Sequence, residues 1–295
     1  MLEKCERVAS INPNQKYDVV GVGNAIVDTL AFADDAFLKA HGVEKGIMTL
    51  VEGDRQGELL NALQNEKLEL RSGGSAANSM HNIALSGGRA VYTGKVAADA
   101  NGEFYRRDLE AAGIRFDVLP LAENEGPTGT CVVMTTPDSE RTMCTHLGVS
   151  TRLSPEDIEH DAIKDAKIVY IEGYLWTGDS TKAASLAAMQ AANDAGIPVA
   201  FTFSDPFLVN LFKDDFRQVL KDHVDIAFCN AEEAKSFTGK DDVQAAVKEI
   251  AELCDLVFVT DSAEGAWGAE DRGAKLHLEA GFPVKAIDTN GAGDA

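Results

Sequence analysis

The chain closes on the stretch Asp288-Thr289-Asn290-Gly291-Ala292-Gly293-Asp294-Ala295, directly after an apolar segment. Two glycines flank an alanine, so the backbone can turn sharply and direct consecutive N–H groups at one point, which is how an anion is held. Asp294 follows at once, and a carboxylate beside such a nest is suited to take a proton from a hydroxyl that attacks a phosphoryl group. On these residues alone, an ordinary glycine turn with a helix-capping Asp stays open as the other interpretation.

Short apolar runs alternate with helical segments through most of the chain, and this alternation predicts an α/β fold. Strands are expected at residues 19–23, 168–171, 199–203, 226–228 and 257–260, helices at 78–86, 102–112, from 154 onward and at 180–195, and a hairpin at 266–278. Such an order predicts a mainly parallel sheet with helices on both faces. Four partly alternating segments are expected to meet as a second, small sheet: 26–33, 47–51, 130–135 and 141–147.

Composition and charge argue against several classes of protein. Of 295 residues, 45% are hydrophobic and 25% charged, as in ordinary globular proteins, and nothing in the sequence resembles a membrane span. A net charge of −21 repels a phosphate backbone, so nucleic acid is not expected as a partner. The five cysteines lack any C-x-x-C spacing, which argues against a disulfide framework or zinc site and favours a reducing cytoplasm. Residues 1–16 are expected to form a loose, flexible tail.

Two glycine-containing segments in the first half are candidates for holding a polar ligand. Gly21-x-Gly23-Asn24 lacks the third glycine of a dinucleotide fingerprint, so its interest lies in Asn24 and Asp28, which could hydrogen-bond substrate hydroxyls or simply cap a turn. The segment Ser72-Gly73-Gly74-Ser75-Ala76-Ala77-Asn78 allows a close approach of backbone to ligand at a helix start, or forms a plain loop with a Ser cap.

Two further segments follow predicted strands, where ligands of open α/β sheets bind. In Asn230-Ala231-Glu232-Glu233 the spacing is explained equally well by a capping box and by a carboxylate acting through water on a magnesium ion. In Thr260-Asp261-Ser262-Ala263-Glu264-Gly265 small hydroxyl residues could contact a triphosphate or make a turn. The chain has no G-x-x-x-x-G-K-[ST] loop, no G-x-S-x-G elbow and no metal-ligand spacing among its histidines.

These motifs in this order resemble the ribokinase-like (PfkB) family of carbohydrate and nucleoside kinases, from about Tyr17 to the end of the chain. The ending D-T-N-G-A-G-D resembles a specific family signature, and the segment around Gly73 and Gly74 resembles its amino-terminal counterpart. The resemblance implies a three-layer α/β/α domain over residues 17–295, with a mainly parallel central sheet. It also implies that the small sheet is a lid that closes over the substrate and excludes water.

The resemblance also implies roles for individual residues. Asp294 becomes the base that deprotonates the substrate hydroxyl, and the N–H groups of Gly291, Ala292 and Gly293 become the anion hole for the transferred phosphoryl group. Because family kinases use ATP with Mg²⁺, Asn230 and Glu233 are expected near the metal and its waters, Glu233 acting through water. Thr260, Ser262 and Gly265 map to the nucleotide side, although the family often has glycine at the position of Ser262. A monovalent cation such as K⁺ near Asp288 is common in relatives.

The expected acceptor is a nucleoside, because the glycine pair followed by Ser75 and Asn78 is similar to the adenosine kinase branch. By that resemblance Tyr174 or Phe207 stacks on the base, Arg141 reaches the phosphates, and the ribose is held by Asn24, Asp28, Gly73, Gly74, Ser75 and Asn78. For either aromatic, plain core packing stays open as an alternative. We therefore expect phosphorylation of the 5′-hydroxyl of a nucleoside, adenosine first. A sugar kinase acting on ribose, fructose or a related compound, and a non-catalytic nucleoside-binding protein, are the alternatives.

The family resemblance carries an expectation about the end of the chain. Relatives continue past the signature through a helix whose amino end supports the anion hole. The carboxyl-terminal helices of the family are therefore expected in a longer, fully active form. The sequence is compatible with either a monomer or a homodimer.

Overall fold

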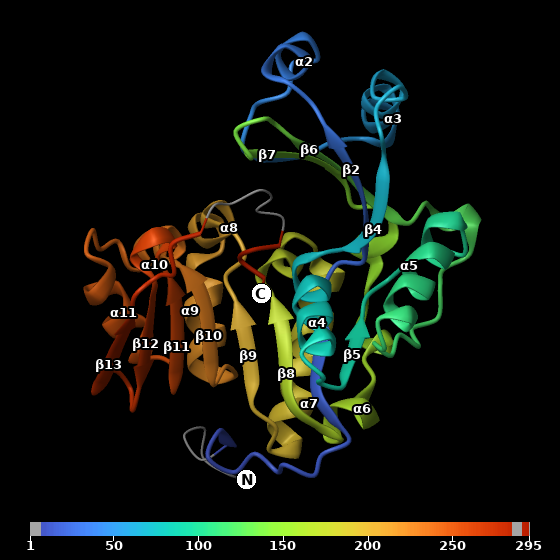
Figure 1. Ribbon diagram of the computed structural model, residues 1–295. Coiled ribbons are helices and arrows are strands. Elements are labelled where there is room, and N and C mark those ends of the chain that lie inside the picture. The colour runs from blue at the N-terminus through green and yellow to red at the C-terminus, as the bar shows by residue number, and fades with distance from the viewer. Residues whose placement is uncertain (1–6, 285–290, 295) are drawn as a thin grey trace.

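The structure is a computed structural model that describes residues 7–284 and 291–294. Figure 1 shows a large α/β body with a small sheet standing above one end of it. The helices are α2 (Asp35–Ala40), α3 (Gly53–Ala62), α4 (Ser75–Leu85), α5 (Ala100–Ala111), α6 (His160–Lys164), α7 (Asp179–Ala195), α8 (Pro206–Leu211), α9 (Lys213–Asp222), α10 (Ala231–Thr238) and α11 (Val243–Ala251). Single 3-10 turns cover Glu123–Glu125, Gly148–Arg152, Pro155–Asp157, Gly173–Thr177 and Ser262–Glu264.

The main sheet confirms the predicted α/β class. Over the described residues its eight strands run in the order β13-β12-β11-β10-β9-β8-β1-β5. All neighbouring pairs from β11 to β5 are parallel, and the hairpin strands β12 and β13 add an antiparallel edge. The strands are β1 (Tyr17–Val22), β5 (Ala90–Thr93), β8 (Ala166–Glu172), β9 (Val199–Thr202), β10 (Ile226–Asn230), β11 (Leu256–Thr260), β12 (Ala266–Glu270) and β13 (Lys275–Glu279).

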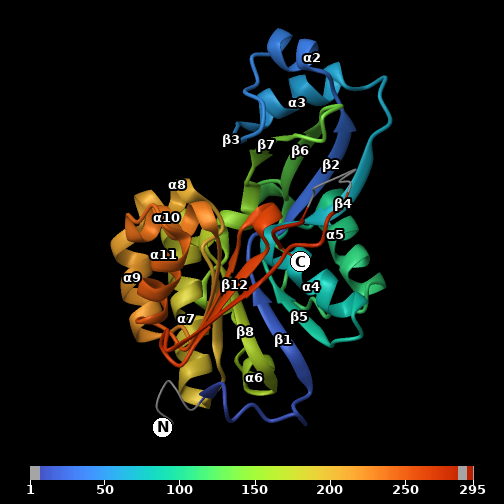
Figure 2. The ribbon, with the colours of Figure 1, turned by 60° about the vertical axis from the view of Figure 1, so that its left-hand side comes forward.

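Side chains of alternating strand positions enter two separate cores, one on each face of the main sheet. Val20 and Val22 of β1 join the larger core, which holds the buried faces of helices α6 to α11. Val19 packs against the second core, which holds the buried residues of α4 and α5. Figure 2 shows the sheet between these two helical layers. The three-layer α/β/α architecture is therefore as predicted.

The small sheet has five strands in the order β3-β7-β6-β2-β4. Four of them lie where alternation predicted strands: β2 (Ile26–Phe32), β3 (Met48–Leu50), β6 (Gly129–Thr135) and β7 (Arg141–His146). The fifth, β4 (Glu69–Gly73), was not predicted, because its sequence alternates poorly and it forms only by pairing with the edge of β2. Helices α2 and α3 pack on one face around a small core that includes Leu38, Leu59 and Val132.

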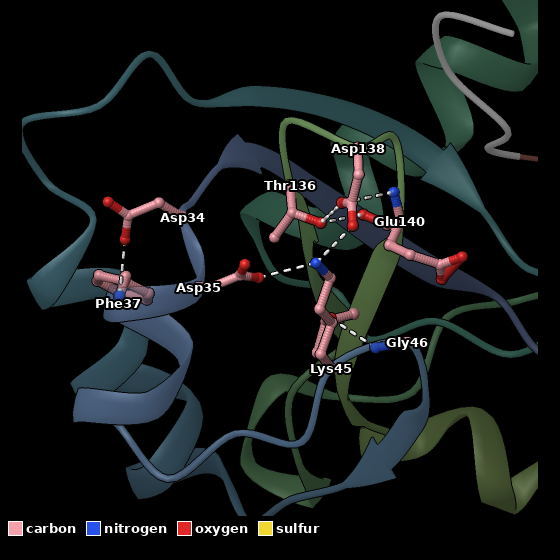
Figure 3. Close-up of polar contacts among 9 residues, drawn as sticks. Asp34, Asp35, Phe37, Lys45, Gly46, Thr136, Asp138 and Glu140 are labelled. Atoms are coloured by element: carbon pink, nitrogen blue, oxygen red, sulfur yellow. Dashed lines mark hydrogen bonds and ion pairs between the residues drawn. The ribbon is translucent and has the colours of Figure 1, made fainter.

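Two ion pairs of one lysine connect separate segments at the outer end of the small sheet. Lys45 lies 2.8 Å from Asp35 at the start of α2 and 2.6 Å from Asp138 in the turn between β6 and β7. Figure 3 shows its ammonium group between the two carboxylates. This lysine links two elements that are far apart in the sequence, but because both carboxylates are exposed, each pair contributes only about 0–1 kcal/mol.

The chain crosses between the two sheets at points that leave almost no space. β1 passes into β2 through residues 23–25, and β4 passes into α4 through Gly73 and Gly74. A side chain at Gly74, where φ is +101°, would place its Cβ 2.2 Å from the carbonyl oxygen of Asn24. Two buried tyrosines hold these crossings from below: Tyr92 donates to the Asn24 carbonyl at 2.9 Å, and Tyr105 donates to the Gly73 carbonyl at 3.0 Å.

The predicted loose tail is wrong at Arg7. Residues 1–6 lie outside the described residues, but the Arg7 side chain is buried and forms an ion pair with buried Asp225 at 2.8 Å. Arg7 also donates to the carbonyl of His223. No local pattern indicates this pair, since its two residues lie more than 200 positions apart.

Two expectations from composition concern membrane spans and disulfides. None of their helices is long and apolar enough to cross a membrane. The four cysteines among them, Cys131, Cys144, Cys229 and Cys254, are buried and not joined in disulfides, while Cys5 lies outside the described part.

The glycine crossing yields a stability prediction. We expect Gly74→Ala to lower the free energy of unfolding by about 2–6 kcal/mol, because its backbone conformation (φ +101°, ψ 136°) is adopted almost only by glycine, at a cost of about 1–3 kcal/mol for alanine, and forced overpacking adds about 1–3 kcal/mol. Gly87→Ala is the matched control: its φ is +86° and nothing lies within 4 Å of the added Cβ, so only the backbone cost applies. Urea unfolding of both variants measures the difference, and equal losses would contradict the steric argument.

Candidate active site

Asp294 lies against the first turns of α4, in the angle between the two sheets. Its Oδ1 accepts a hydrogen bond from the Ser75 hydroxyl at 2.6 Å and its Oδ2 accepts one from the Asn78 amide at 2.9 Å. Figure 1 shows the chain end beside α4 at the upper end of β8. The Ser79 hydroxyl donates to the Asp294 carbonyl at 2.7 Å. Sequence reasoning missed Ser79, although it lies one helical turn after Ser75 and so shares its face.

The glycine segment before Asp294 forms the predicted tight turn. Gly291 has a φ of +68°, and the Asp294 N–H donates back to the Gly291 carbonyl at 3.0 Å. Within the described residues, the N–H groups of Gly291, Ala292 and Gly293 donate no hydrogen bond, and Ala292 and Gly293 are exposed. Toward the described part of the chain, the turn therefore leaves these backbone donors without an acceptor, as an anion site requires. Asp288 lies outside the described residues.

Asp28 faces the same region from the small sheet. The space beside Gly73 is filled by its carboxylate, since a Cβ added at Gly73 would lie 2.2 Å from Asp28 Oδ2. Burial and the negative charge of Asp294 raise the pKa of Asp28 to about 7, and the positive charge of Arg141 opposes this shift. Strand register puts Asp28 and Arg141 on one face of the small sheet. The charges of Arg141 and Asp294 thus both act on the Asp28 carboxylate.

Asn24 is 7% exposed and is held by a buried carboxylate rather than standing free. Its backbone N–H and side-chain Nδ2 donate to Glu172 Oε1 at 2.7 and 3.0 Å. The other oxygen, Oε2, accepts the N–H of Ala76 at 2.8 Å. In the sequence Glu172 is only a charge at the end of a strand, because nothing local reveals its two partners.

The two aromatic candidates differ in their surroundings. Tyr174 packs against the main core, and burial raises the pKa of its hydroxyl well above the usual value, with the charges of Asp205 and Glu172 adding to the shift. Phe207 is 67% exposed at the first turn of α8, where its N–H is capped by Asp205 at 2.7 Å. An exposed phenylalanine is available to stack on a flat ligand. Asp205 was not singled out from the sequence.

The predicted nucleotide side lies on β10 and β11, which are two and three strand spacings from β8, or about 10 and 14 Å. Asn230 and Glu233 form the capping box: the Glu233 N–H donates to Asn230 Oδ1 at 2.8 Å, and the carboxylate accepts both the N–H and the Nδ2 of Asn230 at 2.9 Å. Thr260 pairs with Asn230 in register and is exposed. Ser262 and Gly265 follow in a tight turn with φ of +48° and +108°.

Acidic side chains gather at this end of the main sheet and act on one another. Burial is the main cause that raises the pKa of Glu172 and of Glu233, each to about 7, and the charge of Asp294 adds to both shifts. In the described part of the chain no three His, Cys, Asp or Glu side chains are grouped closely enough to hold a metal ion by themselves. A cation here would need ligands from a bound phosphate as well.

Comparison with known proteins identifies the family. Residues 49–295 match the pfkB family carbohydrate kinase. The guanosine-inosine kinase of Escherichia coli (strain K12) is 30% identical over 258 residues, which are 85% of this chain but only 59% of the relative. The adenosine kinase of Sinorhizobium meliloti is 38% identical, with a TM-score of 0.87 over 95% of this chain and 84% of that one. A probable sugar kinase of Rhizobium etli CFN 42 is 36% identical, with a TM-score of 0.88 and the same coverage. By its matched residues and its two-sheet architecture, this chain belongs to the pfkB family of carbohydrate kinases.

Proposed function

We propose that this protein is an ATP-dependent kinase that phosphorylates the 5′-hydroxyl of a purine nucleoside, with adenosine as its preferred substrate. The observation that carries the proposal is the position of Asp294, held by Ser75 and Asn78 directly after a turn whose N–H groups donate to none of the described residues. Membership of the pfkB family and the similarity to proteins named adenosine kinase and guanosine-inosine kinase support it.

In this proposal the acceptor hydroxyl enters between Asp294 and the glycine turn. The Asp294 carboxylate takes the hydroxyl proton as the oxygen attacks the γ-phosphorus of ATP and the bond to the leaving ADP oxygen breaks. The N–H groups of Gly291, Ala292 and Gly293 stabilise negative charge on the transferred phosphoryl oxygens. Because these donors are backbone groups fixed by the turn, they need no rearrangement at the moment of transfer.

Bound Mg²⁺ with ATP would neutralise phosphate charge that this acidic chain, with a net charge of −21, otherwise repels. Asn230, Thr260, Ser262 and Gly265 are proposed to line the nucleotide side, and Glu233 to act on the metal through water. Both oxygens of Glu233 already accept from Asn230, which fits an outer role better than direct ligation. A monovalent cation such as K⁺ near Asp288 stays a prediction.

The acceptor side favours a nucleoside with a flat base. Asp28 and Asn24 are proposed to hold the ribose hydroxyls beside the glycine pair, while exposed Phe207 or Tyr174 stacks on the base. Arg141, on the same sheet face as Asp28, is proposed to reach the phosphates when the small sheet closes as a lid. A simple sugar would leave the exposed ring of Phe207 unused.

A panel of acceptors tests this function. Adenosine, guanosine, inosine, ribose and fructose are each supplied with Mg²⁺ and ATP, and ADP formation is measured. We expect turnover with a purine nucleoside, highest with adenosine, because stacking of a base on an aromatic ring contributes about 1–3 kcal/mol. Turnover of a sugar alone would favour the sugar kinase alternative. Nucleoside binding without turnover in calorimetry would make the chain a binding protein.

Removing the base separates catalysis from binding. We expect Asp294→Asn to lower kcat by about 10²–10⁴-fold, the usual contribution of a positioned general base, while the nucleoside Kd changes little. Asn keeps the size of the side chain, so Ser75 and Asn78 stay in place. Asp194→Asn, an exposed carboxylate on α7, is the control and should leave kcat unchanged. Substantial turnover by Asp294→Asn would refute the role of Asp294.

A further inference from the structure

We propose that Glu172 is a positioning residue that fixes Asn24 and the first turn of α4 in the geometry that binds the acceptor. This inference rests on the proposed nucleoside site but concerns a side chain that the phosphoryl transfer itself does not use. Glu172 is fully buried at the end of β8. It is bonded to both crossings between the sheets, the one that carries Asn24 and the one that leads into α4.

Three donors converge on this carboxylate, an arrangement that suits its ionised form. The Asn24 N–H and Nδ2 both reach Oε1, and the Ala76 N–H reaches Oε2, at distances between 2.7 and 3.0 Å. An ionised carboxylate only accepts, so it can satisfy all three donors. A protonated one carries an O–H that must find an acceptor of its own. The observed arrangement is therefore the arrangement of ionised Glu172.

The three hydrogen bonds of Glu172, called the tie below, lie so close to Gly23 that no side chain fits there. A Cβ added at Gly23 would lie 2.6 Å from Glu172 Oε2 and 2.8 Å from the Cβ of Ala76. The backbone at Gly23, directly after β1, thus lies against both the carboxylate and the start of α4. If the three hydrogen bonds are disturbed, Asn24 and the first turn of α4 are displaced together.

Glu172 also decides which atom of the Asn24 amide a ligand meets. Because the carboxylate accepts, the Asn24 nitrogen must face it, and the Asn24 oxygen is the atom left over. No hydrogen bond reaches that oxygen from the described residues. A substrate hydroxyl can donate to this oxygen, and an amide turned the other way would offer it a donor instead. Glu172 therefore sets the polarity of the contact as well as its position.

The groups around Glu172 define how it titrates. Burial raises the pKa of Glu172 to about 7, the three donors oppose this, and the charge of Asp294 adds to it. The remaining neighbours are the phenols of Tyr92, Tyr105, Tyr170 and Tyr174, whose own pKa values are all raised, so they stay neutral near pH 7. We expect nucleoside affinity to fall as the pH drops through 7, because protonation breaks the tie.

Fold stability changes with pH in the opposite direction. The folded pKa of about 7 lies above the ordinary value of 4.5, so folding takes up a proton between these values. The contribution of Glu172 to stability is therefore greater at pH 5.5 than at pH 8. Weaker binding at pH 5.5 in a protein that is no less stable would come from the site and not from unfolding.

The experiment is equilibrium binding of adenosine, without ATP, between pH 5.5 and 8.5. We expect Glu172→Gln to raise the adenosine Kd about tenfold or more at pH 8, because the glutamine amide must turn a donor toward one of the three N–H groups. In the unaltered protein, protonation of Asp28 and protonation of Glu172 are both expected to change the adenosine affinity, so that two protons are coupled to binding. Glu172→Gln removes one of these groups, and its affinity should therefore vary less steeply with pH. Glu159→Gln is the matched control, since Glu159 is half-buried with a raised pKa but is bonded to Arg115 near the far end of β8.

A second variant, at Asp28, leaves Glu172 and its three hydrogen bonds in place. Asp28→Asn retains Glu172, so its adenosine affinity must still fall with one proton below pH 7. If Glu172→Gln fails to fold, as circular dichroism would show, the unaltered protein decides the question: the NMR signals of the Asn24 and Ala76 N–H groups must shift with the same pH midpoint as the adenosine affinity, and signals that do not follow it would overturn the role of Glu172. An affinity independent of pH in Asp28→Asn, or an unchanged Kd in folded Glu172→Gln, would overturn the role of Glu172. Absence of adenosine binding by the unaltered protein would instead overturn the proposed function.

Discussion

The close approach of two backbone crossings is the constraint on which the rest of the structure depends. Gly74 passes so near the Asn24 carbonyl that a side chain would overlap it, and Gly73 leaves its own side-chain volume to the Asp28 carboxylate. Only glycine allows both contacts, and this brings the small sheet onto the carboxyl end of β1. The candidate site lies here because this edge is where strand ends, a helix start and the second sheet meet. The positions of Asn24, Asp28 and the start of α4 therefore depend on one steric condition.

Electrostatics at this junction are unusual, because several carboxylates share a small, partly dry region. Asp28, Glu172 and Glu233 each have a pKa raised to about 7, with burial as the first cause and Asp294 as a shared contributor. The groups that oppose these shifts are Arg141 at Asp28, Asn24 and the Ala76 N–H at Glu172, and the Asn230 N–H at Glu233. A neutral acceptor such as a nucleoside enters this region at lower electrostatic cost than an anionic one. The anionic substrate, ATP, is expected where the donors and a metal ion can offset its charge.

The sequence predicted those features that depend on local pattern. Strand and helix alternation, the capping box at Asn230, the hairpin at 266–278 and the turn at Gly291 each follow from residues within a few positions of one another. β4 and β5 were not found, since short strands such as Ala90–Thr93 are stabilised by their neighbours in the sheet and not by their own pattern. The bonds of Glu172, and the Arg7–Asp225 pair, join residues more than 90 positions apart, and no periodicity carries such information. Ser79 was within reach, because helical spacing from Ser75 puts it on the same face.

Asp294 and the acceptor depend on the same side chains, and this has a chemical consequence. Ser75 and Asn78 donate to the two oxygens of Asp294, yet they also stand beside the glycine pair where the acceptor is proposed to bind. Each carboxylate oxygen can accept more than one hydrogen bond, so an acceptor hydroxyl can donate to Asp294 while Ser75 and Asn78 keep their own bonds to it. In the proposed mechanism these two donors therefore orient the carboxylate without occupying all of its lone pairs. The same turn of α4 that holds the proposed base thus also borders the proposed acceptor.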